Sequence, residues 1–134
     1  ISCSKVTTLE GCENTSNIGL SNFTRFSLDN INLIKGNFSF TLDEVLKKTE
    51  SFDLIFFDGN HSKIDTLNYF NKCLKKINSK SIFIFDDINW SIEMKSAWNQ
   101  IIKNDMVTLS FSFFRVGVLF FKKDLKNKNY NFLE

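Results

Sequence analysis

The sequence predicts an α/β protein with a mostly parallel sheet, and three observations lead to this fold class. Short apolar or β-branched runs alternate along the chain with segments whose apolar residues recur at helical spacing, which is typical of a sheet flanked on both faces by helices. Near the end, two β-rich runs follow each other without a helix between them, so the sheet should close with an antiparallel hairpin at one edge. The 134 residues include no proline and 5 glycines, which argues against a turn-dense all-β sandwich.

The first part of the chain alternates strand, helix, strand and helix. These elements are expected over residues 5–10, 14–26, 31–35 and 41–48. Ile18, Phe23 and Phe26 give the first helix its helical spacing. Thr41 and Glu44 form a capping box, which predicts that the second helix begins at Thr41.

The second part continues the alternation and ends with the hairpin. Strands are expected over residues 52–57, 81–85, 107–114 and 117–121. The run at 52–57 (FDLIFF) is almost continuously apolar, which suits a strand buried on both faces. Ser62 and Ser91 are expected to cap the two helices between these strands. The predicted apolar stripes of these helices are Ile64, Leu67, Phe70, Leu74 and Ile77, and Met94, Ala97, Trp98, Ile101 and Ile102.

Composition sets limits on location and partners. A net charge of +2 is too small to indicate nucleic-acid binding, and the sequence offers no membrane span. The number of cysteines is odd, and none of them belongs to a Cys-x-x-Cys motif. This favours free thiols in a reducing cytoplasm for Cys3, Cys12 and Cys73. Residues 1–125 are predicted to form the domain and residues 126–134 a solvated tail. The oligomeric state stays open, a homo-oligomer included.

Three aspartates carry the sharpest chemical signal. Asp58 follows one predicted strand, and Asp86 and Asp87 follow the next. Ligands of open parallel sheets bind outside the carboxyl ends of the strands, so these carboxylates should share one rim. Their mutual repulsion favours a bound cation, and oxygen ligands suit Mg²⁺, Mn²⁺ or Ca²⁺. The alternative is that Asp86 or Asp87 only caps the next helix.

Two further residues at strand ends are candidates for function. His61, the single histidine, lies three residues after Asp58 and has an ordinary pKa suited to a general base at neutral pH. Its alternative is an incidental loop residue. Glu10 ends the first predicted strand, where an acid commonly accepts the two hydroxyls of a ribose. Its alternative is a surface carboxylate or a helix N-terminal charge.

Four segments together resemble class I S-adenosylmethionine-dependent methyltransferases of the small-molecule O-methyltransferase type. These segments are VTTLEG, FDLIFFDGNH, SIFIFDDINW and FRVGVLFF, and they cover nearly the whole chain. The resemblance implies a Rossmann-like methyltransferase fold, S-adenosylmethionine as cofactor and methyl transfer to a small-molecule hydroxyl.

The resemblance also implies roles for individual residues. Glu10 would hold the ribose hydroxyls, and Asn37 and Phe38 would lie near the adenine. The implied cofactor-binding set is Glu10, Gly11, Asn37, Phe38, Asp58 and Gly59. Metal-dependent relatives hold the ion at positions that match Asp58, Asp86 and Asp87. The catalytic base of those relatives, usually a lysine, matches His61.

This sequence departs from the family because it has no glycine-rich turn. The family begins with a strand and a Gly-x-Gly-x-Gly motif, whereas Gly11 and Gly36 stand alone here. The chain therefore resembles the C-terminal two thirds of a methyltransferase, without the central strand expected between those that end at Glu10 and Asp58. As such a fragment it is expected to be inactive, to bind S-adenosylmethionine poorly and to aggregate.

Two other classes of protein remain as alternatives. A non-catalytic α/β module that binds a partner or nucleotide would use the same acids as helix caps. A receiver-type acid cluster is disfavoured, because Glu10 is single and the lysines after the last strand, Lys122 and Lys123, lie at the end of the hairpin.

Overall fold

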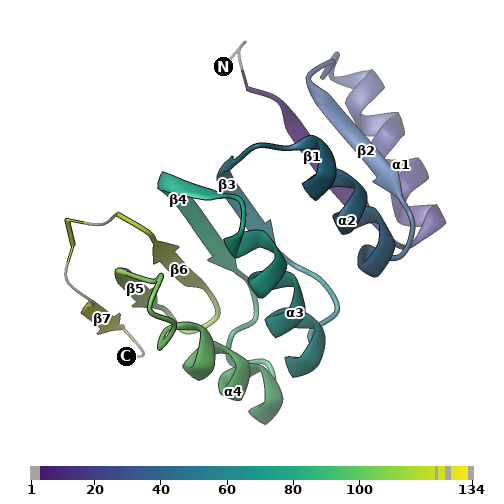
Figure 1. Ribbon diagram of the computed structural model, residues 1–134. Helices are drawn as coiled ribbons and strands as arrows, with labels where there is room; N and C mark the ends of the chain where they lie inside the picture. The colour runs from purple at the N-terminus through teal and green to yellow at the C-terminus, as the bar shows by residue number, and fades with distance from the viewer. Residues whose placement is uncertain (1–3, 123, 126–127, 133–134) are drawn as a thin grey trace. The chain divides into compact units, whose positions relative to one another are not determined.

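The computed structural model describes residues 4–122, 124–125 and 128–132, and the chain divides into two compact units, residues 1–48 and 49–134. Strands and helices alternate from β1 to β5, and two further strands follow (Figure 1). The alternation of strand and helix predicted from the sequence is therefore confirmed. Each unit contains its own sheet, with two strands in the first and five in the second.

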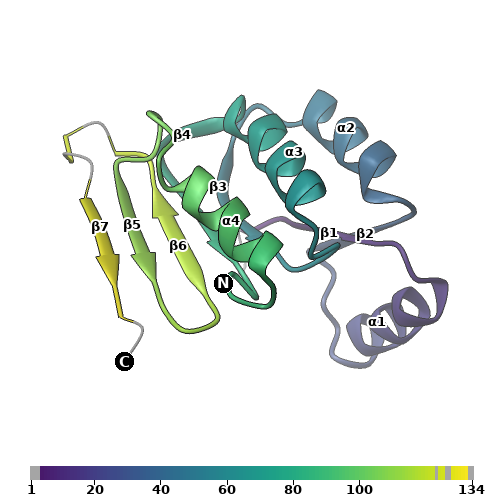
Figure 2. The same cartoon turned by 90° about the horizontal axis from the view of Figure 1, so that it is seen from below.

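The first unit is built on two parallel strands, β1 (Val6–Glu10) and β2 (Ile31–Lys35). Helix α1 (Glu13–Arg25) connects them, and α2 (Phe38–Lys48) follows β2. Figure 2 shows α1 and α2 on opposite sides of the strand pair, as the sequence predicts. The strands are in register from the start of β1 to its end, so both strands stop at the same edge.

Two details of the first unit differ from the prediction. Helix α2 begins at Phe38 rather than at Thr41, because the side chain of Asn37 accepts a hydrogen bond from the Ser39 N–H at 2.8 Å and caps the helix earlier. Thr41 lies inside the helix and is buried. In α1 the expected apolar stripe is incomplete, since Ile18 and Phe26 are exposed.

The second unit has a mixed sheet in the order β3-β4-β6-β5-β7. Its strands span Phe52–Phe57 (β3), Ile77–Phe85 (β4), Leu109–Ser112 (β5), Gly117–Phe120 (β6) and Lys128–Asn131 (β7). β3 and β4 are parallel, and β6 is antiparallel to both β4 and β5. The predicted hairpin is thus confirmed, but its expected place at the edge is wrong. β6 lies inside the sheet, and β7 extends the sheet beyond β5.

Helices α3 (Lys63–Leu74) and α4 (Ile92–Ile101) cover the same face of the second sheet. Phe70 of α3 packs edge-on against Phe83 of β4, and Trp98 of α4 packs against Phe85, which lies on the same face of β4. The expectation of helices on both faces is wrong for this unit. The crossovers from β3 to β4 and from β4 to β5 proceed in one direction along the sheet, and crossovers of the usual right-handed kind then place their helices on one side.

Strand β3 is consequently not buried on both faces, contrary to the prediction. Leu54 and Phe56 are 55% and 53% exposed, because their side chains lie on the opposite face of β3 from those of Ile55 and Phe57. A nearly continuous apolar run indicates a buried strand only where layers cover both faces of the sheet.

The helix caps of the second unit agree with the sequence, whereas one apolar stripe does not. Ser62 and Ser91 accept hydrogen bonds from the backbone N–H groups of Asp65 and Met94, at 3.2 and 3.1 Å. Helix α4 buries most of its predicted stripe. Helix α3 instead buries Thr66, Tyr69, Phe70 and Cys73. The predicted stripe of α3 included Ile64, which is exposed, and Ile77, which begins β4.

Part of the predicted tail forms a strand. β7 pairs in parallel with β5, and its Tyr130 ring stacks on Phe111 at 5.4 Å between ring centroids. The side chains of β7 are exposed, and the predicted tail includes residues 126, 127, 133 and 134, which lie outside the described residues. Cys3 also lies outside them. No helix in the described part of the chain is both long and apolar enough to cross a bilayer.

Candidate functional site

The carboxyl ends of β3 and β4 place the predicted acids side by side. Phe57 is paired with Phe85 in the parallel register, so the residues after them, Asp58 and Asp86, leave the sheet at one edge. The Asp86 N–H donates a hydrogen bond to the Phe57 carbonyl oxygen at 2.9 Å. Helix α4 takes its cap from Ser91. The alternative in which Asp86 or Asp87 serves only as that cap is therefore wrong.

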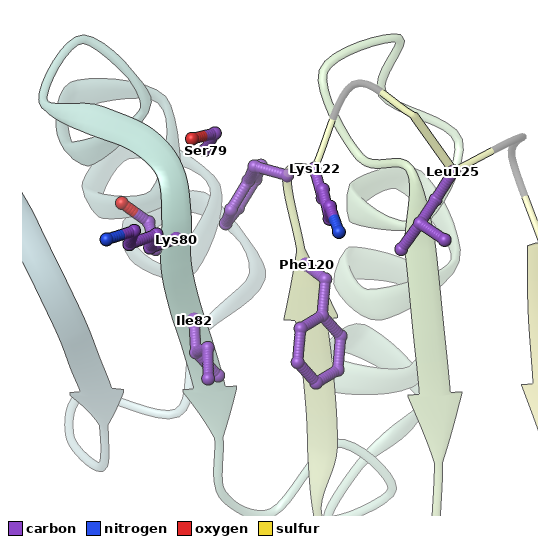
Figure 3. Close-up of a pocket in the computed structure, with 8 residues that line it drawn as sticks. Ser79, Lys80, Ile82, Phe120, Lys122 and Leu125 are labelled. Carbon is purple, nitrogen blue, oxygen red and sulfur yellow. The ribbon is translucent and has the colours of Figure 1, made fainter.

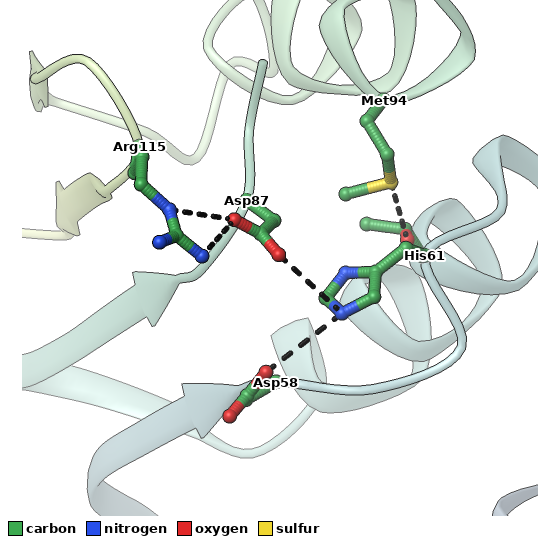
Figure 4. Close-up of polar contacts among 6 residues, drawn as sticks. Asp58, His61, Asp87, Met94 and Arg115 are labelled. Carbon is green, nitrogen blue, oxygen red and sulfur yellow. Dashed lines mark hydrogen bonds and ion pairs between the residues drawn. The ribbon is translucent and has the colours of Figure 1, made fainter. Parts of the chain in front are cut away.

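The loop after β3 holds His61 against two of these carboxylates. Nε2 of His61 lies 3.8 Å from Oδ1 of Asp58 and 3.8 Å from Oδ2 of Asp87 (Figure 4). These distances are too long for hydrogen bonds, so His61 faces both acids without a hydrogen bond to either. Asn60, which has a positive φ of 57°, donates to the Tyr69 hydroxyl at 3.3 Å and fixes the loop.

Asp87 is the central group of this cluster. Its φ of 52° lies in the left-handed region, which is costly for a residue other than glycine and is often found at functional sites. Its side chain is only 12% exposed. Oδ1 accepts hydrogen bonds from Nε and Nη2 of Arg115 at 2.9 and 2.7 Å, whereas Oδ2 faces His61. One carboxylate thus links a histidine and a guanidinium.

Arg115 belongs to the turn between β5 and β6 and is a site residue that the sequence motifs did not predict. Hydrogen bonds to Asp87 are the main cause that raises the pKa of Arg115, and the charges of Asp87, Asp86 and Asp58 add to them. The register offers a signal that could have found it. Gly117 of β6 pairs with Phe85 of β4, so an antiparallel β6 brings the turn before Gly117 beside the residues after Phe85.

Two further hydrogen bonds hold this turn to the loop after β4. The Ile88 N–H donates to the Arg115 carbonyl oxygen at 2.9 Å, and Nδ2 of Asn89 donates to the Phe114 carbonyl oxygen at 2.8 Å. Because both contacts use backbone oxygens of the turn, they place the Arg115 backbone independently of its side chain.

A divalent metal does not fit this cluster well. Among the described residues, no group of three or more His, Cys, Asp or Glu side chains has the spacing of a metal site. Oδ1 of Asp87 already accepts two hydrogen bonds from a guanidinium. The predicted metal ligands Asp58, Asp86 and Asp87 do lie at one edge, but Arg115 already supplies a cation there.

The first unit brings together the predicted residues at the ends of β1 and β2. Oε1 of Glu10 accepts the Cys12 N–H at 2.7 Å, and its carbonyl oxygen accepts the Gly36 N–H at 3.0 Å. A Cβ atom on Gly11 would lie 3.8 Å from the Gly36 carbonyl oxygen. Asn37 caps α2, and Phe38 is the first residue of that helix. The side-chain hydrogen bonds of Glu10 and Asn37 therefore serve the local backbone.

The second unit also has a cavity of about 380 Å³, near the end of β4 that lies opposite to Asp86 (Figure 3). It lies beside the start of β4 and the end of β6, and its lining includes Lys80, Ile82, Phe120 and Lys122. None of the residues predicted to carry chemistry lines it. Gly59, the remaining predicted cofactor residue, follows Asp58 in the loop that carries His61.

Comparison with known proteins identifies the family. A family model described as a methyltransferase domain, Methyltransf_24, matches residues 4–88. The chain therefore belongs to this methyltransferase family, and the resemblance found in the sequence is confirmed. A comparison with curated protein sequences gives no match.

Solved methyltransferase structures share the fold. PaMTH1, an SAH-bound methyltransferase from Podospora anserina, is 18% identical, with a TM-score of 0.73 over 90% of this chain and 62% of that chain. An O-methyltransferase from Bacillus cereus, also with SAH, is 23% identical, with a TM-score of 0.71 over 87% of this chain and 63% of that one.

A third structure extends the comparison. The O-methyltransferase TomG from Streptomyces achromogenes, in complex with SAM, is 15% identical and has a TM-score of 0.67 over 89% of this chain and 62% of that one. The chain thus spans less than two thirds of the length of each of these solved relatives. At these identities the likeness concerns the fold.

Proposed function

We propose that the protein transfers the methyl group of S-adenosylmethionine to a hydroxyl oxygen of a small molecule, with His61 as the general base. Membership of the methyltransferase family supports the reaction class. The solved relatives from Bacillus cereus and Streptomyces achromogenes are O-methyltransferases, which supports oxygen as the acceptor atom.

The single observation that carries the role of His61 is its position between two acids at the carboxyl ends of adjacent parallel strands. Nε2 lies 3.8 Å from both Asp58 and Asp87, and its ring is 30% exposed, so a small molecule can reach it. A positioned base must be within reach of the proton that it removes, and contacts of this kind commonly tighten when substrate binds.

The chemistry divides between the cofactor and the side chains. S-adenosylmethionine supplies an electrophilic methyl group on a sulfonium. Nε2 of His61 would accept the proton of the acceptor hydroxyl as its oxygen bonds to the methyl carbon and the carbon–sulfur bond breaks, with S-adenosylhomocysteine as the leaving group. Asp58 and Asp87 then stabilise the imidazolium, because both carboxylates lie close to the nitrogen that gains the proton.

The predicted cofactor contacts remain part of this proposal. In the first unit, the Glu10 carboxylate can accept ribose hydroxyls in addition to the Cys12 N–H, because it offers about four acceptor positions. Gly11, Asn37 and Phe38 adjoin Glu10 at the same strand ends. In the second unit, Asp58 and Gly59 are the proposed contacts.

The proposal needs no divalent metal, although the sequence predicted one at Asp58, Asp86 and Asp87. Coordination by Asp87 would compete with its two hydrogen bonds from Arg115. We therefore assign proton transfer and charge stabilisation to side chains of this chain alone.

The test is methyl transfer by active enzyme that contains this chain. Labelled S-adenosylmethionine is supplied with a panel of small phenols and alcohols, and with matched amines and thiols. We expect labelled ethers from at least one hydroxyl compound, and the label should be lost when the hydroxyl is replaced by hydrogen. Label on amines or thiols alone would contradict the assignment to oxygen.

A further inference from the structure

We propose that Arg115 is the built-in cation of this site, which takes the place of a divalent metal and positions Asp87 against His61. This inference rests on the proposed function, since it assigns a role within the same cluster. Arg115 is a positioning residue in this account, because it acts on Asp87 and not on the reacting atoms.

The charges at the rim favour a cation. Asp58, Asp86 and Asp87 leave two adjacent strands at one edge, and three carboxylates in such proximity repel one another. The guanidinium of Arg115 binds Asp87 through two hydrogen bonds, and the charges of Asp86 and Asp58 also contribute to its raised pKa. It is permanently charged at any physiological pH, so it supplies this compensation without a metal.

The two carboxylate oxygens of Asp87 face different partners. Both hydrogen bonds from Arg115 reach Oδ1, at 2.9 and 2.7 Å, and Oδ2 faces His61 at 3.8 Å. Two donors on one oxygen restrict rotation of the carboxylate, because a turned Asp87 would lose both bonds. The orientation of Oδ2 toward the base therefore depends on Arg115.

The fold holds Arg115 in place through its backbone. The Ile88 N–H binds the Arg115 carbonyl oxygen, and the Asn89 side chain binds that of Phe114. The Arg115 side chain is 62% exposed, whereas that of Asp87 is 12% exposed. An arginine so exposed contributes little to the hydrophobic core, so its removal should spare the fold and change the site.

The test is a titration of the chain with Mn²⁺, followed by the relaxation of water protons, because this measures metal binding without any turnover. We expect no saturable Mn²⁺ binding at the rim of the native chain. Arg115→Gln should gain saturable Mn²⁺ binding, at least about tenfold above any residual affinity of the native chain, since it removes the positive charge that binds Asp87. Adding Asp87→Asn to Arg115→Gln should abolish the gain.

Matched variants separate this effect from a general loss of charge. Arg25→Gln removes the same charge from α1 and should leave Mn²⁺ binding unchanged. Arg115→Lys keeps a cation and should also show no gain. Circular dichroism establishes that each variant is folded. Native Mn²⁺ binding that Asp87→Asn removes would overturn the proposal, and so would an Arg115→Gln variant that binds no more Mn²⁺ than Arg25→Gln.

A kinetic measurement tests the positioning role of Arg115. In active enzyme, Arg115→Gln should lower kcat with little change in KM for the acceptor, and Arg115→Lys should recover part of the loss. Equal kcat in native enzyme and Arg115→Gln, with or without EDTA, would overturn the positioning role. If no methyl transfer is found at all, the proposed function fails, whereas the Mn²⁺ titration still decides whether Arg115 is the cation of the site.

Discussion

The site residues predicted at the strand ends differ between the two units in the sequence range of their side-chain contacts. In the first unit, Glu10 and Asn37 accept hydrogen bonds from backbone N–H groups only two residues away. In the second unit, Asp87 is bound by Arg115, which lies 28 residues further along the chain. The first pattern completes local turns and helix starts, and the second joins separate elements of the fold.

This difference supports the proposal that the charged cluster of the second unit carries the chemistry. Short-range capping occurs wherever a helix needs an acceptor, so it predicts structure better than function. A long-range cluster of charged groups has no such local explanation, and α3 and α4 already have their own serine caps. In the proposed function, the chemical step therefore belongs to the second unit.

The largest expected effect is on the rate of methyl transfer. His61→Ala in active enzyme should lower the rate about 10²- to 10⁴-fold, the usual contribution of a general base. Added imidazole should restore part of the activity. A loss of less than about tenfold would reduce His61 to a loop residue and remove the proposed distinction between the units.

A smaller effect is expected in the first unit, on binding alone. In active enzyme that contains this chain, Glu10→Gln should weaken S-adenosylhomocysteine binding about 10- to 100-fold, because hydrogen bonds to a charged acceptor are lost. The glutamine still offers an oxygen to the Cys12 N–H, so the turn is kept. Calorimetric titration measures the change, and Glu13→Gln, in the first turn of α1, is the control. Equal weakening by both variants would show that Glu10 is a surface carboxylate.

The packing of the two units differs too, and a glycine in each tests it. An alanine Cβ at Gly117 would lie 2.6 Å from Cζ2 of Trp98, whose ring is buried and donates to the Ser112 hydroxyl. Gly117→Ala should cost about 1–3 kcal/mol of unfolding free energy. Gly11→Ala meets nothing nearer than 3.8 Å and should cost much less. Urea denaturation followed by circular dichroism compares them, and equal losses would contradict this account of the core.

The smallest effect concerns the thiols. Hydrogen bonds from Thr15 lower the pKa of the exposed Cys12, whereas burial raises the pKa of Cys73 to about 12. Iodoacetamide at pH 8 should therefore label Cys12 well before Cys73, as measured by mass spectrometry of peptides.

The raised pKa of Cys73 also sets a direction for stability. Above the ordinary pKa of a thiol the unfolded chain loses this proton while the folded chain keeps it, so stability falls as pH rises toward about 12. A Cys73→Ala variant should show a shallower fall over the same range. In the iodoacetamide experiment, equal labelling rates for Cys73 and Cys12 would contradict the buried position of Cys73.

Much of the fold was predictable because its signals are local. Strand β3 was identified from an apolar run, and the starts of α3 and α4 from Ser62 and Ser91. The exposure of Leu54 and Phe56 was not predictable, because it depends on which face the helices cover. Strand β7 was missed because its side chains are polar or exposed and its pairing with β5 is tertiary.

Part of the candidate site was also predictable from the sequence, and part was not. The positions of Asp58 and His61 follow from the end of one strand, and that of Asp87 from the end of the next. Arg115 was missed because its relation to Asp87 depends on β6 running antiparallel beside β4. No periodicity or motif within either segment contains that information.

The most direct test of the account is a double-mutant cycle on the rate of methyl transfer. The central claim is that Asp87 acts through His61, to which it presents Oδ2 at 3.8 Å. Rates are measured in active enzyme with His61→Ala, Asp87→Asn and both changes together. We predict that the double variant is no slower than His61→Ala alone, within about threefold, because residues that act as a unit are strongly non-additive. Losses that multiply would show that the two side chains act independently, and would contradict the cluster as the site of the chemical step.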